Sequence, residues 1–127
     1  MIRFITAFFL TMAFTLFAFA DEVATLELNK RGDQLLSYNF GRVQNNTKTT
    51  IYYGLKNTGT SDLEIKAITI IGAHFFAQSE CPQILKPGKK CLTSISYWPV
   101  IEGLHHGELT WETSDGQIHL SLWGESY

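Results

Sequence analysis

The amino-acid sequence predicts an all-β fold: a single antiparallel β-sandwich of about seven short strands, with one disulfide, after a cleaved signal peptide. Two observations lead to this prediction. Apolar residues recur at every second position through most of the chain, and the strand-forming residues Thr, Ile, Tyr, Phe and Trp are frequent. Asn, Pro and Gly interrupt these runs at short intervals, as in sandwiches and barrels. No stretch of the mature chain shows a convincing helical pattern.

The first 20 residues have the pattern of a secretory signal peptide. A basic start at Arg3 precedes an apolar run from Phe4 to Phe19, and Ala18-Phe19-Ala20 has small residues at the positions that signal peptidase requires. An uncleaved membrane anchor is the alternative, because the apolar run is close to the roughly 17 residues that span a bilayer. We therefore expect export to the periplasm or secretion, with membrane attachment only if the segment is retained.

Residues 21–32 come next, with apolar residues at Val23, Leu26 and Leu28. This segment is either a tether or an added edge strand. We expect the sandwich domain itself to occupy residues 33–127, which is close to the usual size of one domain.

Six strands follow from the alternating runs, at residues 35–40, 49–57, 63–71, 92–98, 108–113 and 118–123. In the third run the apolar positions shift from Leu63 and Ile65 to Ile68 and Ile70, which predicts a bulge near Ala67. The last two strands are joined by a tight hairpin, in which Asp115-Gly116 is expected to supply positive φ angles. Each strand has one apolar and one polar face, as expected when one side of a sheet meets a core.

Two cysteines, Cys81 and Cys91, are present. In an exported protein a single pair is most simply interpreted as a disulfide. Metal binding is the weaker alternative, because two cysteines without a second pair match zinc spacing poorly.

Composition and motifs argue against several classes of function. The net charge is −2, without the basic stripe that binds nucleic acid. No catalytic motif and no phosphate-binding glycine loop is present, and the four histidines lack metal-ligand spacing, so no catalytic residue, metal or cofactor is predicted. His105 and His106 are adjacent and should point to opposite faces of a strand. Three lysines surround Pro87-Gly88, either as a solvated hairpin tip or as a contact for an acidic partner.

Three aromatic residues, Tyr52, Trp98 and Trp123, fall on strand positions opposite the predicted core. They would form a protein-binding surface if they gather in one patch. The alternatives are that another part of the chain covers them, or that they are scattered on the surface.

The order of several short motifs resembles a known family. These are Asn57-Thr58-Gly59 after a strand, Cys81, then Leu85-x-Pro87-Gly88-x-x-Cys91. They resemble the Ig-like domains of the ASH (HYDIN-type) group, close to the major sperm protein and PapD-like sandwiches, whose bacterial versions occur in exported "choice-of-anchor D" proteins. The resemblance covers residues 35–124 and implies a seven-stranded sandwich, a bridge between the two cysteines, and a non-enzymatic role in adhesion, scaffolding or assembly.

The sequence therefore favours an exported Ig-like module of the bacterial cell envelope that binds another protein, with Trp98 and Trp123 as contact residues together with Tyr52. One alternative is a periplasmic chaperone or assembly factor that acts by strand pairing. A second is a small-ligand or metal binder that uses the surface histidines.

Overall fold

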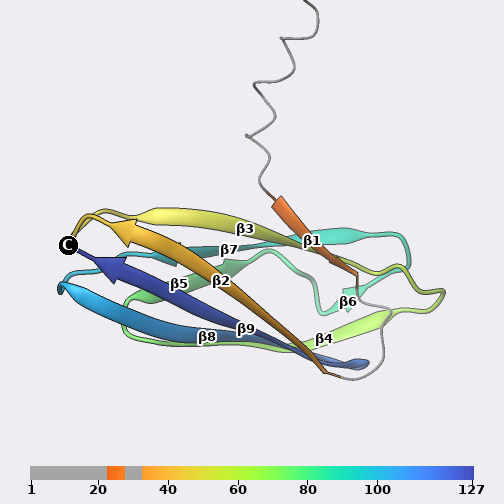
Figure 1. Ribbon diagram of the computed structural model, residues 1–127. Coiled ribbons are helices and arrows are strands. Elements are labelled where there is room, and N and C mark those ends of the chain that lie inside the picture. Colours follow the sequence, from red (N-terminus) through yellow and green to blue (C-terminus); the bar gives the residue numbers. More distant parts are fainter. Residues whose placement is uncertain (1–22, 28–32) are drawn as a thin grey trace, which may run out of the picture.

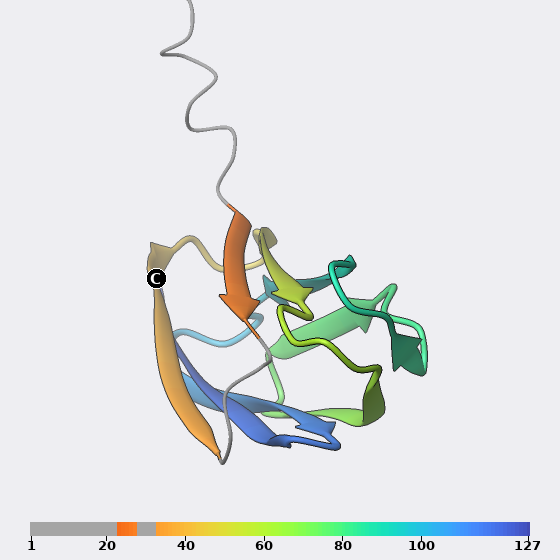
Figure 2. The ribbon, with the colours of Figure 1, turned by 90° about the vertical axis from the view of Figure 1, so that its right-hand side faces the viewer.

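The computed structural model describes residues 23–27 and 33–127, and the predicted signal peptide lies outside these ranges. Two β-sheets pack face to face (Figures 1 and 2). One has four strands in the order β1-β3-β7-β5, and the other has five in the order β2-β9-β8-β4-β6. The predicted all-β sandwich is confirmed. None of the described residues belongs to a helix that is long and apolar enough to cross a membrane.

The nine strands in these ranges are β1 (Val23–Glu27), β2 (Gln34–Val43), β3 (Thr49–Lys56), β4 (Leu63–Ile71), β5 (Phe75–Ser79), β6 (Ile84–Leu85), β7 (Lys90–Tyr97), β8 (Gly103–Thr113) and β9 (Gly116–Ser126). All six predicted strands are present, and β8 and β9 extend well beyond the predicted ranges. The bulge in β4 is confirmed, because the register with β8 shifts between Ile65 and Ala67. The short strands β5 and β6 had no predicted counterpart.

The hairpin between β8 and β9 differs in detail from the prediction. Thr113 pairs with Gly116, so the turn residues are Ser114 and Asp115. Gly116 has a positive φ of 132°, but Asp115 does not, and that part of the prediction was wrong. The Thr113 side chain closes the turn instead: its Oγ1 accepts from the amide of Asp115 at 3.1 Å and donates to the carbonyl of Gly116 at 2.8 Å.

Two strand pairs are parallel, unlike the others. β1 pairs in parallel with β3, and β2 pairs in parallel with β9. Each forms an outer edge of its sheet. The N-terminal part of the chain therefore contributes one strand to each layer of the sandwich.

The core lies between the sheets and consists of the inward side chains of the alternating runs. Among those with no exposed surface are Leu55, Ile95, Leu109, Trp111, Leu120 and Leu122. Each such side chain stabilises the fold by about 1.5–3 kcal/mol through removal of apolar surface from water. Trp111 Nε1 donates to Thr93 Oγ1 at 3.3 Å, so the one polar atom of the buried indole has a partner.

The predicted disulfide is confirmed between Cys81 and Cys91. It joins the loop after β5 to the start of β7. Nearby, the side chain of Asn57 is buried and its amide donates to the carbonyls of Ser61 and Leu85, at 2.9 and 2.8 Å. These bonds hold the turn after β3 against β6, which explains why an Asn is found at this turn.

Candidate functional site

The structure separates the three predicted contact residues onto two faces. Tyr52 lies on β3 and Trp98 directly follows β7, both in the four-stranded sheet, whereas Trp123 lies on β9 in the five-stranded sheet. The three side chains have the same exposed fraction, 46%. Tyr52 and Trp98 thus share one outer face, and Trp123 belongs to the opposite one.

A fourth aromatic residue joins Tyr52 and Trp98. Phe76 on β5 is 50% exposed, and its ring centroid lies 6.4 Å from that of Trp98 in an edge-on arrangement. Sequence reasoning missed Phe76 because β5 was not predicted. The sequence of this strand, Phe-Phe-Ala-Gln-Ser, does not alternate, and only the structure shows that Phe75 is buried and Phe76 exposed.

Small side chains on β7 leave a hollow between these rings. The register places Ser94 between Tyr52 of β3 and Gln78 of β5, and Ser96 between Thr50 and Phe76. The hollow has a volume of about 350 Å³. We call it the aromatic hollow: its floor is formed by Ser94 and Ser96, and Tyr52, Phe76 and Trp98 stand around it.

The polar groups of the aromatic hollow are oriented by local hydrogen bonds. Thr50 Oγ1 and Ser96 Oγ lie 2.8 Å apart, and Ser94 Oγ donates to the carbonyl of Gln78 at 3.2 Å. Lys48 places its ammonium group 5.5 Å from the centre of the Trp98 ring. Aromatic rings above a polar floor, in a partly open site, are typical of surfaces that bind other molecules rather than of a core.

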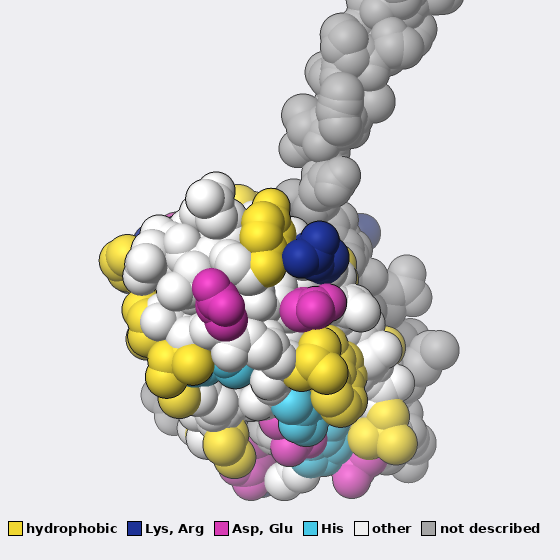
Figure 3. Space-filling view, turned by 60° about the vertical axis from the view of Figure 1, so that its left-hand side comes forward, with side chains coloured by type: hydrophobic (Ala, Val, Ile, Leu, Met, Phe, Trp, Pro, Cys, Tyr) yellow, Lys and Arg dark blue, Asp and Glu magenta, His cyan; other side chains and the backbone are white. Residues whose placement is uncertain are grey.

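The opposite face holds Trp123 in a different setting. The centroid of the His106 ring lies 4.0 Å from that of the Trp123 ring, and the two planes are tilted by 35°. On the same face, His119 Nδ1 is 3.4 Å from Glu108 Oε2 and 3.3 Å from Thr110 Oγ1. Figure 3 shows histidine, hydrophobic and acidic side chains side by side on this part of the surface. Among the described residues, the ring beside Trp123 is thus the imidazole of His106, whereas the ring beside Trp98 is that of Phe76.

His105 points to the inner side of β8, opposite to His106, as predicted from strand alternation. Its Nδ1 lies 2.6 Å from the hydroxyl of buried Tyr97, and its ring centroid is 4.0 Å from that of His74. Burial, and secondly the nearby His74, lower the pKa of His105 from its ordinary value of 6.5. Burial, with a smaller contribution from Glu125, raises the pKa of Tyr97. These contacts are accounted for by packing.

Across residues 23–27 and 33–127, no three His, Cys, Asp or Glu side chains lie close enough together to hold a metal ion. The four histidines are divided between the inner pair at His74 and His105 and the outer positions of His106 and His119. Within the described part of the chain, the histidines therefore do not gather into one cluster.

A second charged feature lies at the other end of the four-stranded sheet. Lys86, Lys89 and Lys90, which we call the lysine hairpin, line a hollow of about 640 Å³ together with Glu80 and the exposed Ile84. The backbone of Asn57 holds the hairpin in place. Its main-chain carbonyl accepts from the main-chain N–H of Gly88 at 2.7 Å, and its main-chain N–H donates to the carbonyl of Lys89 at 3.0 Å. The position of the lysines is therefore defined by a buried residue.

Comparison with known proteins gives one family match. The model of the "HYDIN/CFA65/VesB-like, Ig-like domain" family matches residues 24–125, most of the chain. A search of curated proteins found no significant match.

Solved structures with the same fold include an ASH/PapD-like domain of human CEP192. The TM-score is 0.61 at 16% identity, and the alignment covers 72% of this chain and 80% of that one. Two proteases of Vibrio cholerae also match: VesB (TM-score 0.54, 17% identity, 74% of this chain and 30% of that one) and the secreted serine protease VesC (0.56, 18%, 69% and 21%). The chain thus corresponds to about a fifth of VesC and under a third of VesB. At these identities the structures show a shared fold.

Proposed function

Because the chain belongs to the HYDIN/CFA65/VesB-like Ig-like domain family, we propose that it is an exported, non-catalytic module of the bacterial cell envelope that binds another protein. Export is supported by the signal-peptide pattern of residues 1–20 and by the description of the similar VesC as secreted. The disulfide is consistent with an oxidising compartment.

The observation that carries the proposal is the aromatic hollow. Tyr52, Phe76 and Trp98 are each about half exposed and surround one open site on one face. Aromatic residues contribute much of the energy in protein interfaces, where a few large side chains dominate binding. The partner is therefore expected to contact the outer face of the four-stranded sheet, with Trp98 and Tyr52 as principal contacts.

Replacement of Trp98 or Tyr52 by Ser tests this proposal. Because both side chains are about half exposed, the variants should keep the thermal unfolding temperature of the wild type within a few degrees. Capture of a partner from envelope extract, measured by quantitative mass spectrometry, should fall at least tenfold. Trp123→Ser is the matched comparison, with the same residue type and exposed fraction on the opposite face.

If Trp123→Ser lowers capture and the two other variants do not, the contact surface is the five-stranded sheet, and our placement of the site is wrong. Undiminished capture by all three variants would contradict an aromatic contact surface on either face.

Strand pairing is the second candidate function, and one observation favours it. β5 is the outermost strand on its side of the four-stranded sheet, so its outward backbone groups lie at a sheet edge. Edge strands accept extended segments from other chains. The amide of Glu80 bonds to Leu92 of β7, so in this register the amide of Ala77 points away from β7 to the free edge. Replacing Ala77 by Pro would remove that edge donor, and loss of capture in this variant but not in Trp98→Ser would favour the strand-pairing role.

A further inference from the structure

The aromatic hollow is one end of a longer groove. Beside it lies a second hollow of about 270 Å³, and Tyr52, Gln78 and Ser94 line both. Glu80 and Leu92 in turn line both this second hollow and the one at the lysine hairpin. The three hollows therefore adjoin one another in a row, and we call them together the β7 groove.

The β7 groove follows the outward side chains of β7. These are Lys90, Leu92, Ser94 and Ser96, with Trp98 just beyond the strand. From Lys90 to Trp98 the chain extends about 26 Å at the usual rise of 3.3 Å per residue. β3 and β5 lie on either side of β7. Larger side chains of these neighbours, such as Tyr52 and Phe76, stand higher than the two serines and form the walls.

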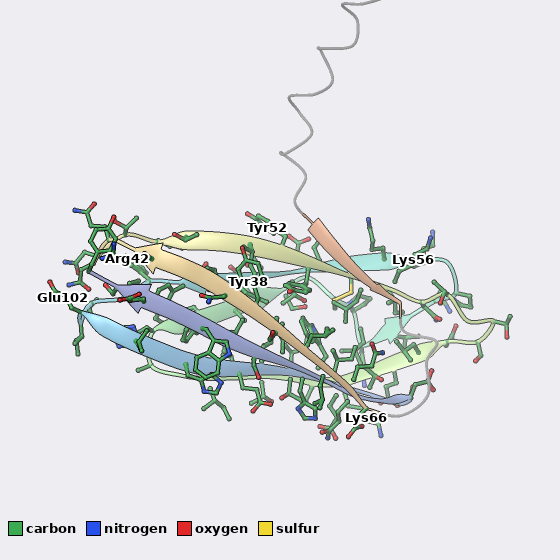
Figure 4. All side chains as sticks on the ribbon, viewed as in Figure 1. Tyr38, Arg42, Tyr52, Lys56, Lys66 and Glu102 are labelled. Carbon is green, nitrogen blue, oxygen red and sulfur yellow. A yellow bond between two sulfur atoms is a disulfide. The ribbon has the colours of Figure 1, made fainter. Side chains whose placement is uncertain are left out.

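The two ends of the groove differ in charge. At one end are the aromatic rings, and at the other is the lysine hairpin. Lys56 adds to this end, because it pairs directly with Lys90 across β3 and β7. Figure 4 labels Tyr52 and Lys56 at two points along β3. Like charges directly opposite each other on neighbouring strands destabilise a sheet, and a negatively charged ligand beside Lys90 would offset this repulsion.

Acidic residues lie near some of these lysines: Glu27 of β1 is the register partner of Lys56 on its other side. Lys86 lies 3.6 Å from Asp62, in a pair whose side chains are both more than half exposed and which therefore contributes little stability. Glu80 is the acidic residue in the lining of this hollow. Among the described residues, Lys89 and Lys90 form no ion pair, so these two lysines are the groups of the hairpin that an acidic ligand would contact.

Resting on the proposed function, we propose that the partner presents an extended polypeptide segment of about eight residues, which lies along the β7 groove. Its apolar or aromatic side chains contact Trp98, Phe76 and Tyr52, and its acidic side chains contact the lysine hairpin. β7 is hydrogen-bonded on both sides, to β3 and β5. The segment is therefore recognised by its side chains over the face of the sheet and not by addition of a strand.

The length of the groove and the charge at one end favour a polypeptide over a neutral glycan. A sugar chain would stack on the aromatic rings, but it would leave the lysines without a counter-charge. An acidic segment satisfies both ends at once.

Synthetic peptides test the inference on the exported protein, purified from the cell envelope. The probe is a fluorescent ten-residue peptide with Trp and Leu at one end, a Ser/Thr spacer, and three Asp or Glu residues at the other. In one control peptide the acids are replaced by Asn and Gln, and in another the acids directly follow the apolar pair. Binding is measured by fluorescence anisotropy.

We expect the wild type to bind the probe at least tenfold more tightly than either control peptide. Lys89→Glu and Lys90→Glu should each weaken binding at least fivefold, and Trp98→Ser at least tenfold. Raising the salt concentration from 50 to 500 mM should weaken wild-type binding severalfold, because exposed charges are screened. Lys66→Glu is the matched control, since this exposed lysine lies on β4 in the other sheet.

The inference is wrong if the probe does not bind up to about 1 mM, or if the control peptides bind as tightly as the probe. It is also wrong if Lys66→Glu weakens binding as much as Lys89→Glu and Lys90→Glu do. A neutral oligosaccharide whose binding depends on Trp98 but is unchanged in the two lysine variants would likewise overturn it. The capture experiment on envelope extract shows whether only the inference about the peptide segment fails or whether the proposed function fails as well. If capture depends on Trp98 but not on Lys89 or Lys90, the proposed function stands and the inference about the segment falls.

Discussion

Tyr97 is the residue around which one end of the core is arranged. Its side chain has no exposed surface, and its ring lies 4.9 Å from Phe75 and 5.5 Å from Phe40. On one side its hydroxyl contacts His105, and on another its ring packs directly over the backbone of Gly124. Small changes at either neighbour are therefore transmitted to the core.

Gly124→Ala should destabilise the protein. An added Cβ would lie 2.4 Å from the Tyr97 ring, so the ring or the strand must move. Overpacking of this kind costs about 1–3 kcal/mol of unfolding free energy, which urea denaturation can measure. The control is Ser121→Ala, on the same strand but on its other face, where surface substitutions change stability by about 0.5 kcal/mol or less. Equal stabilities of the two variants would show that the ring adjusts without cost.

His105 should make stability depend on pH. Because burial and His74 lower its pKa in the folded state, the unfolded chain takes up the proton at higher pH. The contribution of His105 to the free energy of unfolding is therefore fully present above the unfolded-state pKa of about 6.5, and it is lost as the pH falls through that value. We expect the wild type to lose more unfolding free energy between pH 7.5 and 5 than His105→Gln. Ser121→Ala, on the outer face of β9 and without a titratable group, should keep the wild-type pH dependence; an unchanged pH dependence in His105→Gln would contradict the assignment.

At the scale of elements, the disulfide closes the loop that carries β6 and the lysine hairpin. The two cysteines are 10 residues apart. Closing a loop of this length stabilises the folded state by about 2.5–3 kcal/mol on the chain-entropy model. The double variant Cys81→Ala, Cys91→Ala should lose about this much unfolding free energy in urea. A reductant should lower the wild type to the same level and leave the variant unchanged, whereas a loss below about 1 kcal/mol would show that Asn57 alone holds the loop.

The elements differed in how well the sequence predicted them. Long alternating runs such as Thr49–Lys56 were predicted almost to the residue, because one buried and one exposed face require a period of two. β6 has two residues and carries no period at all. Its strand conformation depends on its tertiary neighbours: its register with β4 and the buried amide of Asn57.

Strand direction and the composition of the site also depend on tertiary neighbours, so the local sequence pattern could not predict them. That β1 and β2 pair in parallel depends on which distant strand each one meets, and local pattern does not contain this information. Tyr52, Trp98 and Trp123 were all predicted to face outward, and all three are exposed. The strand order determines that they lie on two different sheets, and it also determines that Phe76 lies beside Trp98.

At the scale of the whole molecule, the groove and the core share one strand. The outward side chains of β7 form the floor of the groove, and its inward side chains, including Thr93, Ile95 and Tyr97, are completely buried. The floor thus belongs to the most tightly packed part of the sandwich, and it should have the same shape before and after a ligand binds.

Such a surface is preorganised, so little conformational entropy is lost when a ligand docks on it. A substitution at Ile95 that loosens the packing would shift Ser94 and Ser96 on the other side of the same backbone. Selection for stability and selection for recognition would then both act on the eight residues of β7. A substitution on its inward face would be limited by its effect on binding, and a substitution on its outward face by its effect on packing.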